Sequence, residues 1–197
     1  MAKYTIDQVI DAGIRTYSKL GESFTMSDVA KELGTKASSL YRHVQNKREL
    51  YYALVTREFD RFNSKIENFA ADNQNPNKII KFVGNLILEI ARDDYQLFKL
   101  MFLSQPPPAS TDTVGPFEQK CTPRTIDDLL WLVRGLPQVD EEDSVNLTFT
   151  LMGLVLGSAI LTSEVYEELI GGILPQDQYS TFHKYVLDKV GNFLNLD

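Results

Sequence analysis

Apolar residues recur at steps of three and four along nearly the whole chain, and this spacing predicts helices almost throughout. No alternating apolar–polar run with an Asn-Gly or Asp-Gly turn indicates a β-hairpin. The expected helices cover about residues 5–20, 26–33, 37–43, 47–71, 76–92, 95–103, 117–134, 141–170 and 176–194. The pattern therefore predicts an all-α protein of about nine helices.

Capping residues and breaks indicate where these helices begin and end. Thr5-x-x-Gln8 and Asn46-x-x-Glu49 are capping boxes that open the first and fourth helices. The run Asn73-Gln-Asn-Pro-Asn separates the fourth helix from the fifth, and residues 104–116 hold four prolines and a glycine, so we expect a loop there. The fourth helix therefore continues from the N-terminal helices into the rest of the chain.

Residues 25–50 predict a helix-turn-helix unit. Thr25 and Asp28 form a capping box for a short helix, and Gly34 stands where a helix C-terminus favours a left-handed residue. After a tight turn, a second short helix runs from Ala37 to about residue 43 with Leu40 as its inward anchor. In a helix-turn-helix, the second helix enters the major groove of DNA.

The outward residues of this second helix are Lys36, Ser38, Ser39, Tyr41 and Arg42. They are hydrogen-bond donors and cations, whereas an ordinary solvated face mixes Glu with Lys. The alternative is a generic three-helix piece of a larger α-protein, because capping boxes are common and the apolar positions are what packing requires.

The net charge of −7 is unevenly distributed along the 197 residues. Residues 1–50 carry eight Lys or Arg and six Asp or Glu, a net charge of +2, which leaves −9 for the remainder. A mildly basic head on an acidic body is typical of a protein that contacts phosphates with one end only.

The order of residues in about 4–52 resembles the TetR family of one-component repressors, most closely its tetracycline-repressor branch. The positions that match the family signature are Thr25, Asp28, Val29, Ala30, Leu33, Gly34, Ser39, Leu40, Tyr41, His43, Val44, Lys47 and Leu50. One departure is Lys36, where the family often has Ser as the N-cap of the reading helix, so that the cap has to come from elsewhere, with Ser38 as a candidate. The resemblance implies a DNA-binding domain at residues 1–47 and a helical ligand-binding and dimerisation domain at 48–197.

The DNA-contacting set that we expect is Thr25, Lys36, Ala37, Ser38, Ser39, Tyr41, Arg42, His43 and Lys47. Arg42 can donate two hydrogen bonds to guanine O6 and N7. The resemblance implies a phosphate contact for Tyr41. Lys47 opens the fourth helix, where free N–H groups favour a phosphate, so we expect it to position the head on the DNA backbone.

The body of the chain is rich in aromatic residues and Met, which either line a cavity between helices or simply fill the core. The resemblance implies an unidentified small-molecule inducer there. The candidate pocket residues are Phe62, Phe82, Tyr95, Phe98, Met101, Phe102, Trp131, Phe149 and Met152.

The resemblance also implies that the last two helices pack against their copies in a homodimer. Dimerisation agrees with DNA recognition, because one short helix covers few base pairs and a two-fold dimer reads a palindromic operator. The candidate interface residues are Leu151, Leu154, Val155, Phe182, Val186, Val190 and Phe193, and part of both helices also belongs to the core.

Other classes of function find little support in the sequence. The two His residues lack a surrounding motif, and no P-loop, H-E-x-x-H, G-x-S-x-G or C-x-x-C pattern is present, so we expect neither an enzyme nor a metal or cofactor. Cys121 is the single cysteine, and the longest apolar run, residues 147–162, is short for a membrane span. We expect a cytoplasmic ligand-responsive regulator without membrane attachment. The alternative is a helical ligand-binding or adaptor protein that does not bind DNA.

Overall fold

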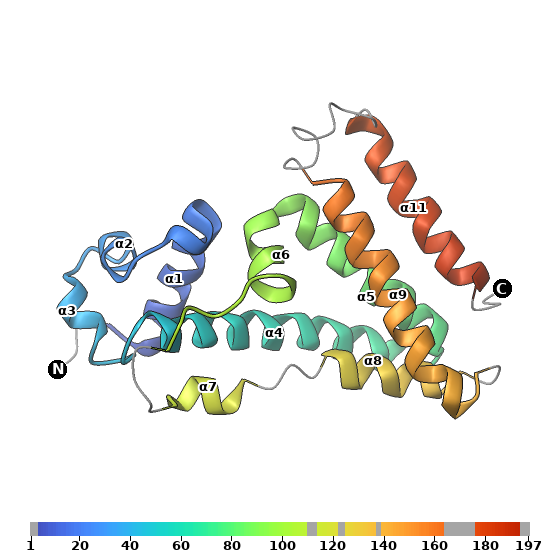
Figure 1. The fold of residues 1–197 in the computed structure, drawn as a ribbon, viewed down its shortest axis with the longest axis horizontal. Coiled ribbons are helices and arrows are strands. Elements are labelled where there is room, and N and C mark those ends of the chain that lie inside the picture. The colour runs from blue at the N-terminus through green and yellow to red at the C-terminus, as the bar shows by residue number, and fades with distance from the viewer. Residues whose placement is uncertain (1–3, 110–113, 122–124, 137–138, 164–175, 194–197) are drawn as a thin grey trace. The chain divides into compact units, whose positions relative to one another are not determined.

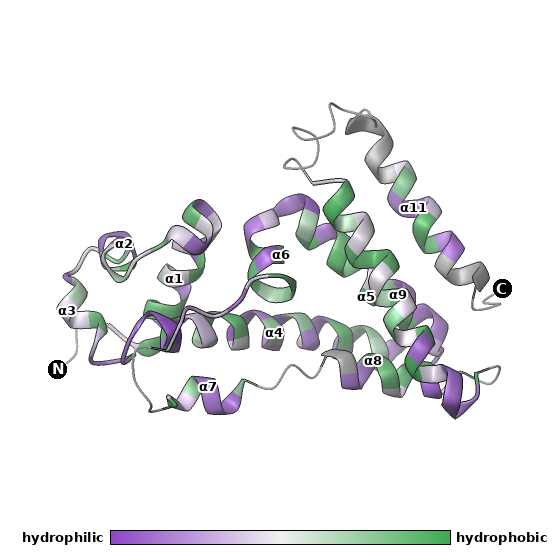
Figure 2. Cartoon of the chain, in the orientation of Figure 1, coloured by the Kyte–Doolittle hydropathy of each residue, from purple (hydrophilic) through white to green (hydrophobic). Residues whose placement is uncertain are grey.

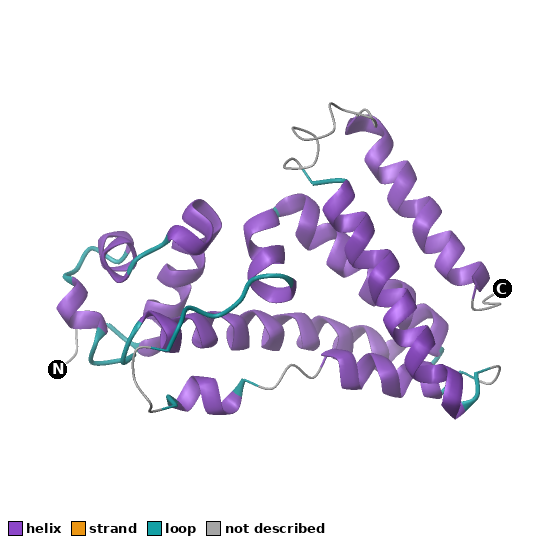
Figure 3. Ribbon diagram, in the orientation of Figure 1, coloured by secondary structure: helices purple, strands orange, loops and turns teal. Residues whose placement is uncertain are grey.

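A computed structural model of the protein describes residues 4–109, 114–121, 125–136, 139–163 and 176–193. These residues form helices joined by turns and loops (Figure 3), so the predicted all-α class is confirmed. The elements, labelled in Figure 1, are α1 (Ile6–Leu20), the 3-10 turn η1 (Gly21–Ser23), α2 (Met26–Glu32), α3 (Ala37–Leu40), α4 (Lys47–Asp72), α5 (Pro76–Asp93), α6 (Tyr95–Phe102), α7 (Pro116–Lys120), α8 (Thr125–Arg134), α9 (Glu141–Leu161) and α11 (Gln176–Phe193).

The predicted capping boxes open α1 and α2. The Thr5 side chain accepts a hydrogen bond from the Gln8 N–H at 3.2 Å, and Gln8 Oε1 accepts one from the Thr5 N–H at 2.9 Å. Thr25 and Asp28 exchange the same two bonds, at 3.2 and 2.9 Å. Each pair satisfies two N–H groups that would otherwise lack a partner at a helix start, which explains why these helices begin where the sequence indicates.

The third capping box forms only by half. The Glu49 N–H donates to Asn46 Oδ1 at 2.8 Å, as expected for the start of α4. The Glu49 carboxylate does not complete the box, because its Oε1 accepts the backbone N–H of Phe117 at 3.1 Å. Glu49 is 4 % exposed, so this bond joins the start of α4 to α7 in the interior.

The chain divides into two compact units. Unit 1 comprises Met1–Phe62 and Asp94–Pro123, and unit 2 comprises Asn63–Asp93 and Arg124–Asp197. The helix α4 runs through the division between them. The division predicted after residue 47 separates DNA binding from ligand binding, and it remains a prediction.

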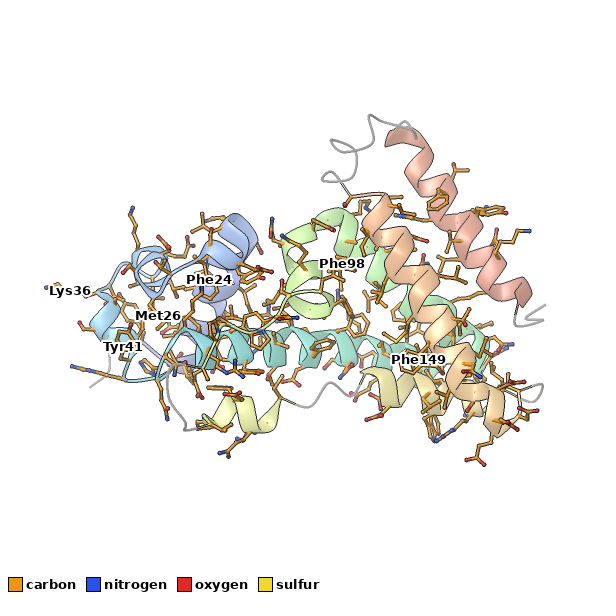
Figure 4. The ribbon with its side chains drawn as sticks, viewed as in Figure 1. Phe24, Met26, Lys36, Tyr41, Phe98 and Phe149 are labelled. Atoms are coloured by element: carbon orange, nitrogen blue, oxygen red, sulfur yellow. The ribbon has the colours of Figure 1, made fainter. Side chains whose placement is uncertain are left out.

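The core of unit 1 is built around the helix-turn-helix. Its largest fully buried side chains include Tyr17, Phe24, Leu40, Leu50 and Leu54, and the rings of Tyr17 and Phe24 lie 5.5 Å apart. Figure 4 labels Phe24 and Met26, the first residue of α2, which is also buried. The helix α6 packs on α1 and adds Leu100 to the same cluster. Residues far along the chain therefore complete the core on which α2 and α3 rest.

Ion pairs join α1 to α4 at the surface of unit 1. Arg57 contacts Asp7 and Asp11, and Arg61 contacts Asp11 at 3.0 Å. Arg61 also pairs with Glu58 at 2.6 Å. Burial raises the pKa of the Glu58 carboxyl above its usual range, and the Arg61 guanidinium opposes that rise.

In unit 2, which comprises Asn63–Asp93 and Arg124–Asp197, the helices α5, α8, α9 and α11 pack on one another. A β-carbon at Gly84 of α5 would lie 2.9 Å from Leu187 Cδ2, so glycine lets α11 approach α5 closely. Most of α9 after its first turns is hydrophobic (Figure 2). By length and composition alone α9 could cross a membrane, but a core helix of a soluble protein passes the same test.

Two of the long predicted helices are shorter than the sequence pattern indicated. The helix expected over residues 117–134 is divided into α7 and α8, because Cys121 leaves the helical conformation with a ψ of 90° and Pro123 cannot donate a helix hydrogen bond. The helix expected over residues 141–170 ends at Leu161, where the Thr162 hydroxyl donates back to the Ser158 carbonyl at 2.8 Å. Residues 164–170 lie outside the described part of the chain.

Candidate functional site

The turn between α2 and α3 has the geometry that the sequence predicts. Gly34 has a φ of +70°, in the left-handed region that favours glycine. The Thr35 N–H donates to the Ala30 carbonyl at 2.8 Å, and the Gly34 N–H donates to the Lys31 carbonyl at 3.1 Å. These bonds satisfy the last carbonyls of α2 and turn the chain sharply into α3.

The reading helix α3 begins at Ala37, without a side-chain cap. Lys36 occupies the N-cap with extended backbone, and its carbonyl accepts the Ser39 N–H at 2.9 Å. Ser38 is the second residue of the helix, so its expected role as the cap is wrong. After Leu40 the chain continues as a helical turn, in which the Val44 N–H donates to the Leu40 carbonyl at 3.1 Å. Leu40 and Val44 are at most 2 % exposed and anchor this segment in the core.

The outward face of this segment carries the donors expected to contact DNA. Lys36, Ser38, Tyr41 and Arg42 are exposed, and Figure 4 shows Lys36 and Tyr41 at the outer edge of α3. The remaining expected residues of the segment, Ala37, Ser39 and His43, are half-buried. Residues 33–48 contain four Lys or Arg and no Asp or Glu. The surface is therefore suited to an anionic partner.

Thr25 has a defined structural role at the start of α2. Its hydroxyl accepts the Asp28 N–H and donates to Asp28 Oδ2 at 2.6 Å. The bond from Thr25 lowers the pKa of the Asp28 carboxyl, which stays ionised and favourably placed at the positive end of α2.

Lys47 already has partners within unit 1. Its ammonium donates to the Glu22 carbonyl at 2.8 Å and lies 4.4 Å from the centre of the Phe24 ring. Partial burial lowers the pKa of the Lys47 ammonium from its usual value. A phosphate contact by Lys47 remains a prediction, and it would require the ammonium to share or leave these partners.

Arg48, which the sequence did not single out, ties α4 to a distant part of unit 1. Its guanidinium donates to Glu118 at 2.6 Å, to the Pro107 carbonyl at 2.6 Å and to the Tyr52 hydroxyl at 3.1 Å. Two of these partners lie 59 and 70 residues further along the chain. Sequence spacing gives no signal for such a contact.

Unit 2 contains a cavity of about 460 Å³ lined by thirteen residues of α4, α5, α8 and the α4–α5 turn. Its lining residues are Asn63, Ile66, Glu67, Ala70, Asn73, Gln74, Pro76, Ile79, Val83, Asp128, Leu129, Trp131 and Leu132. Trp131 is the one member of the expected pocket set in this lining. The volume falls in the range of small-molecule sites in proteins.

The other expected pocket residues lie elsewhere. Phe62, Phe98 and Met101 are buried in unit 1, and the Phe102 ring lies 5.5 to 6.0 Å from those of Phe98 and Phe62. The Tyr95 ring lies 5.6 Å from that of Phe98. These side chains contact one another as core residues do.

Three more expected pocket residues lie in unit 2, outside the cavity lining. Phe82 stacks on Phe69 with ring centres 4.1 Å apart, Phe149 is 60 % exposed and Met152 is half-buried. Aromatic content therefore did not indicate which side chains border the cavity.

The expected dimer-interface residues divide by exposure. Leu151, Val155 and Val186 are buried within unit 2 and are not available to a second copy, so they are better described as core residues. Leu154 is 42 % exposed and Phe182 is half-buried, whereas the side chains of Val190 and Phe193 lie outside the described part of the chain. Large apolar side chains exposed on α9 and α11 are Val145, Phe149, Leu154, Leu161 and Tyr185.

The described residues include no group of three or more His, Cys, Asp or Glu arranged to hold a metal ion. The single cysteine, Cys121, is half-buried, and burial raises the pKa of its thiol.

Comparison with known proteins connects this geometry with a family. Residues 9–54 match the family described as bacterial regulatory proteins, tetR family. Over 143 residues, covering 72 % of this chain and 76 % of the relative, the sequence is 27 % identical to the biofilm operon icaADBC HTH-type negative transcriptional regulator IcaR of Staphylococcus epidermidis.

Two solved structures have the same fold over nearly the full length. AibR, solved in complex with isovaleryl coenzyme A and operator DNA, has a TM-score of 0.64 at 18 % identity, with coverage of 95 % of this chain and 96 % of AibR. FadR of Bacillus subtilis, solved with stearoyl-CoA, has a TM-score of 0.65 at 15 % identity, with coverage of 94 % and 97 %.

Proposed function

Because the chain belongs to the tetR family of bacterial regulatory proteins, we propose that it is a cytoplasmic repressor that binds a palindromic DNA operator as a homodimer and is released by a small-molecule inducer. The observation that carries this proposal is the exposed face of Lys36, Ser38, Tyr41 and Arg42, in a segment without carboxylates. The name of the relative IcaR, a negative transcriptional regulator, supports repression.

Arg42 is the residue we assign to base recognition. It is exposed just after α3, and a guanidinium can donate two hydrogen bonds to guanine, which is worth about 1–3 kcal/mol against a wrong base. Tyr41 and Lys36 are assigned to phosphates, which position the head without reading sequence. Thr25 and Lys47 complete the contacts near the starts of α2 and α4.

The homodimer is assigned to the exposed apolar side chains of α9 and α11. Phe149, Leu154 and Tyr185 are 60 %, 42 % and 58 % exposed, which is unusual for large apolar and aromatic side chains. A β-carbon at Gly153 or Gly157 would have no atom within 4 Å, so this side of α9 leaves room for a second helix to approach. Of the interface set predicted from the sequence, Leu154 and Phe182 are accessible to such a partner, and Val190 and Phe193 stay predictions.

The inducer is assigned to the cavity of unit 2. Asn63, Ile66, Glu67 and Ala70 of α4 line it, and α4 also carries Lys47 at its other end in unit 1. A bound ligand that favours one position of α4 would change the spacing of the two reading helices in the dimer. A hundredfold loss of DNA affinity requires about 2.7 kcal/mol of such coupling.

DNA binding is tested with the full chain and an operator selected from a random DNA pool. Arg42→Ala should reduce affinity for the selected operator and relax its preference at one base pair of each half-site. Arg134→Ala, which removes an exposed arginine of α8 in unit 2, serves as the matched control and should change neither. An equal loss on every operator variant would make Arg42 a backbone contact. Failure of the wild type to select any DNA would favour the ligand-binding module that does not bind DNA.

A further inference from the structure

The charge of the cavity in unit 2 identifies the class of its ligand, an inference that rests on the proposed function because it concerns the same site. The floor of the cavity is apolar. Ile79, Val83, Leu129 and Leu132 are each at most 9 % exposed, and Ile66 is half-buried beside them. Such a floor suits a hydrocarbon or aromatic body.

The rim of the cavity is acidic. Glu67 and Asp128 are exposed lining residues, and the thirteen lining residues include no Lys, Arg or His. Within the described part of the chain, no ion pair involves either carboxylate. Two carboxylates without a nearby cation in the lining favour a positive ligand group and oppose a negative one.

Trp131 adds a second feature with the same preference. Its side chain is 74 % exposed at the cavity, although Trp is usually among the most covered residues. The face of an indole attracts organic cations, and quaternary ammonium groups above all.

Helix ends do not reverse this preference. The C-terminal turn of α4, at Ala70, carries partial negative charge, and the N-terminus of α5, at Pro76, carries partial positive charge. Both ends border the cavity, and their partial charges have opposite signs. The side-chain carboxylates therefore determine the sign of the charge that the cavity presents to a ligand.

We propose that the cavity binds an amphipathic organic cation, with its apolar body on the floor and its ammonium group near Glu67, Asp128 and Trp131. This class differs from the coenzyme A thioesters in the structures of AibR and FadR. The phosphates of a coenzyme A group would meet carboxylates at this rim and find no lining cation.

The test compares probes that differ in head-group charge. Decyltrimethylammonium, decanoate and stearoyl-CoA are titrated below micelle concentrations into the full-length protein, with binding measured by calorimetry and by the fluorescence of Trp131, the only tryptophan. Decyltrimethylammonium should bind at least about tenfold more tightly than decanoate, which corresponds to about 1.4 kcal/mol.

Variants locate the site. Glu67→Gln with Asp128→Asn should weaken decyltrimethylammonium binding about tenfold, whereas Asp60→Asn, at an exposed carboxylate of α4 outside the cavity lining, should not. Ala70→Phe places a ring in the cavity and should abolish binding. Circular dichroism melts show that each variant is folded.

The outcomes separate this inference from the proposed function, because operator release is followed by fluorescence anisotropy in the same titrations. Tighter binding of decanoate or stearoyl-CoA, or cation binding that is unchanged in the Gln/Asn or Ala70→Phe variants, overturns the ligand class. If decanoate or stearoyl-CoA releases the operator, the inducer model stands although the proposed cationic ligand class is wrong. Charge-dependent cation binding without operator release supports the ligand class and overturns the inducer model.

Discussion

Truncating Phe98 and truncating Trp131 should have opposite effects on stability and on ligand binding. Both were candidate pocket residues from the sequence, but Phe98 is fully buried in unit 1 whereas Trp131 is 74 % exposed at the cavity of unit 2. We expect Phe98→Ala to destabilise the protein strongly with little effect on the affinity of the folded protein for its ligand. Trp131→Ala should do the reverse.

The magnitudes follow from burial. A fully buried Phe replaced by Ala typically costs about 3–5 kcal/mol, from lost transfer energy and the cavity that remains. The Trp131 side chain has a surface of roughly 200 Å², of which about a quarter is covered. At ~25 cal/mol per Å², burial of that quarter contributes about 1 kcal/mol to stability. The two variants should therefore differ by about 2–4 kcal/mol.

Urea unfolding at a fixed protomer concentration measures the free energies, because the stability of a dimer depends on concentration. Calorimetric titration with a cavity ligand measures affinity for the folded protein. Phe98→Leu, which keeps most of the volume, should cost about 1.5 kcal/mol or less and remains folded for the same titration. A Trp131→Ala loss above 2 kcal/mol, or weaker ligand binding by Phe98→Leu than by Trp131→Ala, would refute the assignment of core and cavity.

Three further expectations concern other parts of the molecule. Gly34→Ala should cost about 1–2 kcal/mol in urea unfolding, because the φ of +70° is unfavourable for alanine. Burial raises the pKa of Glu58, so its folded form favours the proton, and its contribution to stability is present below the ordinary glutamate pKa and lost as pH rises. Unfolding of Glu58→Gln should accordingly become less favourable relative to that of the wild type as pH rises from about 4 to about 7, because only the wild type loses this contribution; an unchanged difference would contradict the raised pKa. Phe149→Ser should shift the proposed dimer toward monomer in sedimentation experiments, whereas Trp131→Ala should not.

The local features of the fold could be predicted because neighbouring residues determine them. The capping boxes at Thr5 and Thr25 and the left-handed Gly34 depend on atoms within a few residues of each other. Leu40 was identified as an anchor because helical spacing shows which side of a short helix faces the core.

Features that depend on distant contacts could not be predicted in the same way. The bond of Glu49 to Phe117 replaces half of a capping box, and its partner lies 68 residues away. Helical spacing shows that Phe98 and Phe62 face inward, but it does not distinguish a ring packed on other rings from a ring beside a cavity. Pro123 was the available signal that the helix predicted over residues 117–134 is divided, and the apolar pattern on either side obscured it.

The discontinuous composition of unit 1 limits how this regulator can be cut and recombined. The chain leaves the unit after Phe62 and returns to it at Asp94, and Leu100 then joins the buried cluster beneath α2 and α3. A fragment that stops near residue 62 would leave the Tyr51 hydroxyl without the Ser104 carbonyl to which it donates, and would lack the Glu118 carboxylate that Arg48 binds. A ribosome must also synthesise residues 94–121 before the head can acquire its complete core. Hybrid regulators made by exchanging heads should therefore carry α6 and α7 along with the first helices.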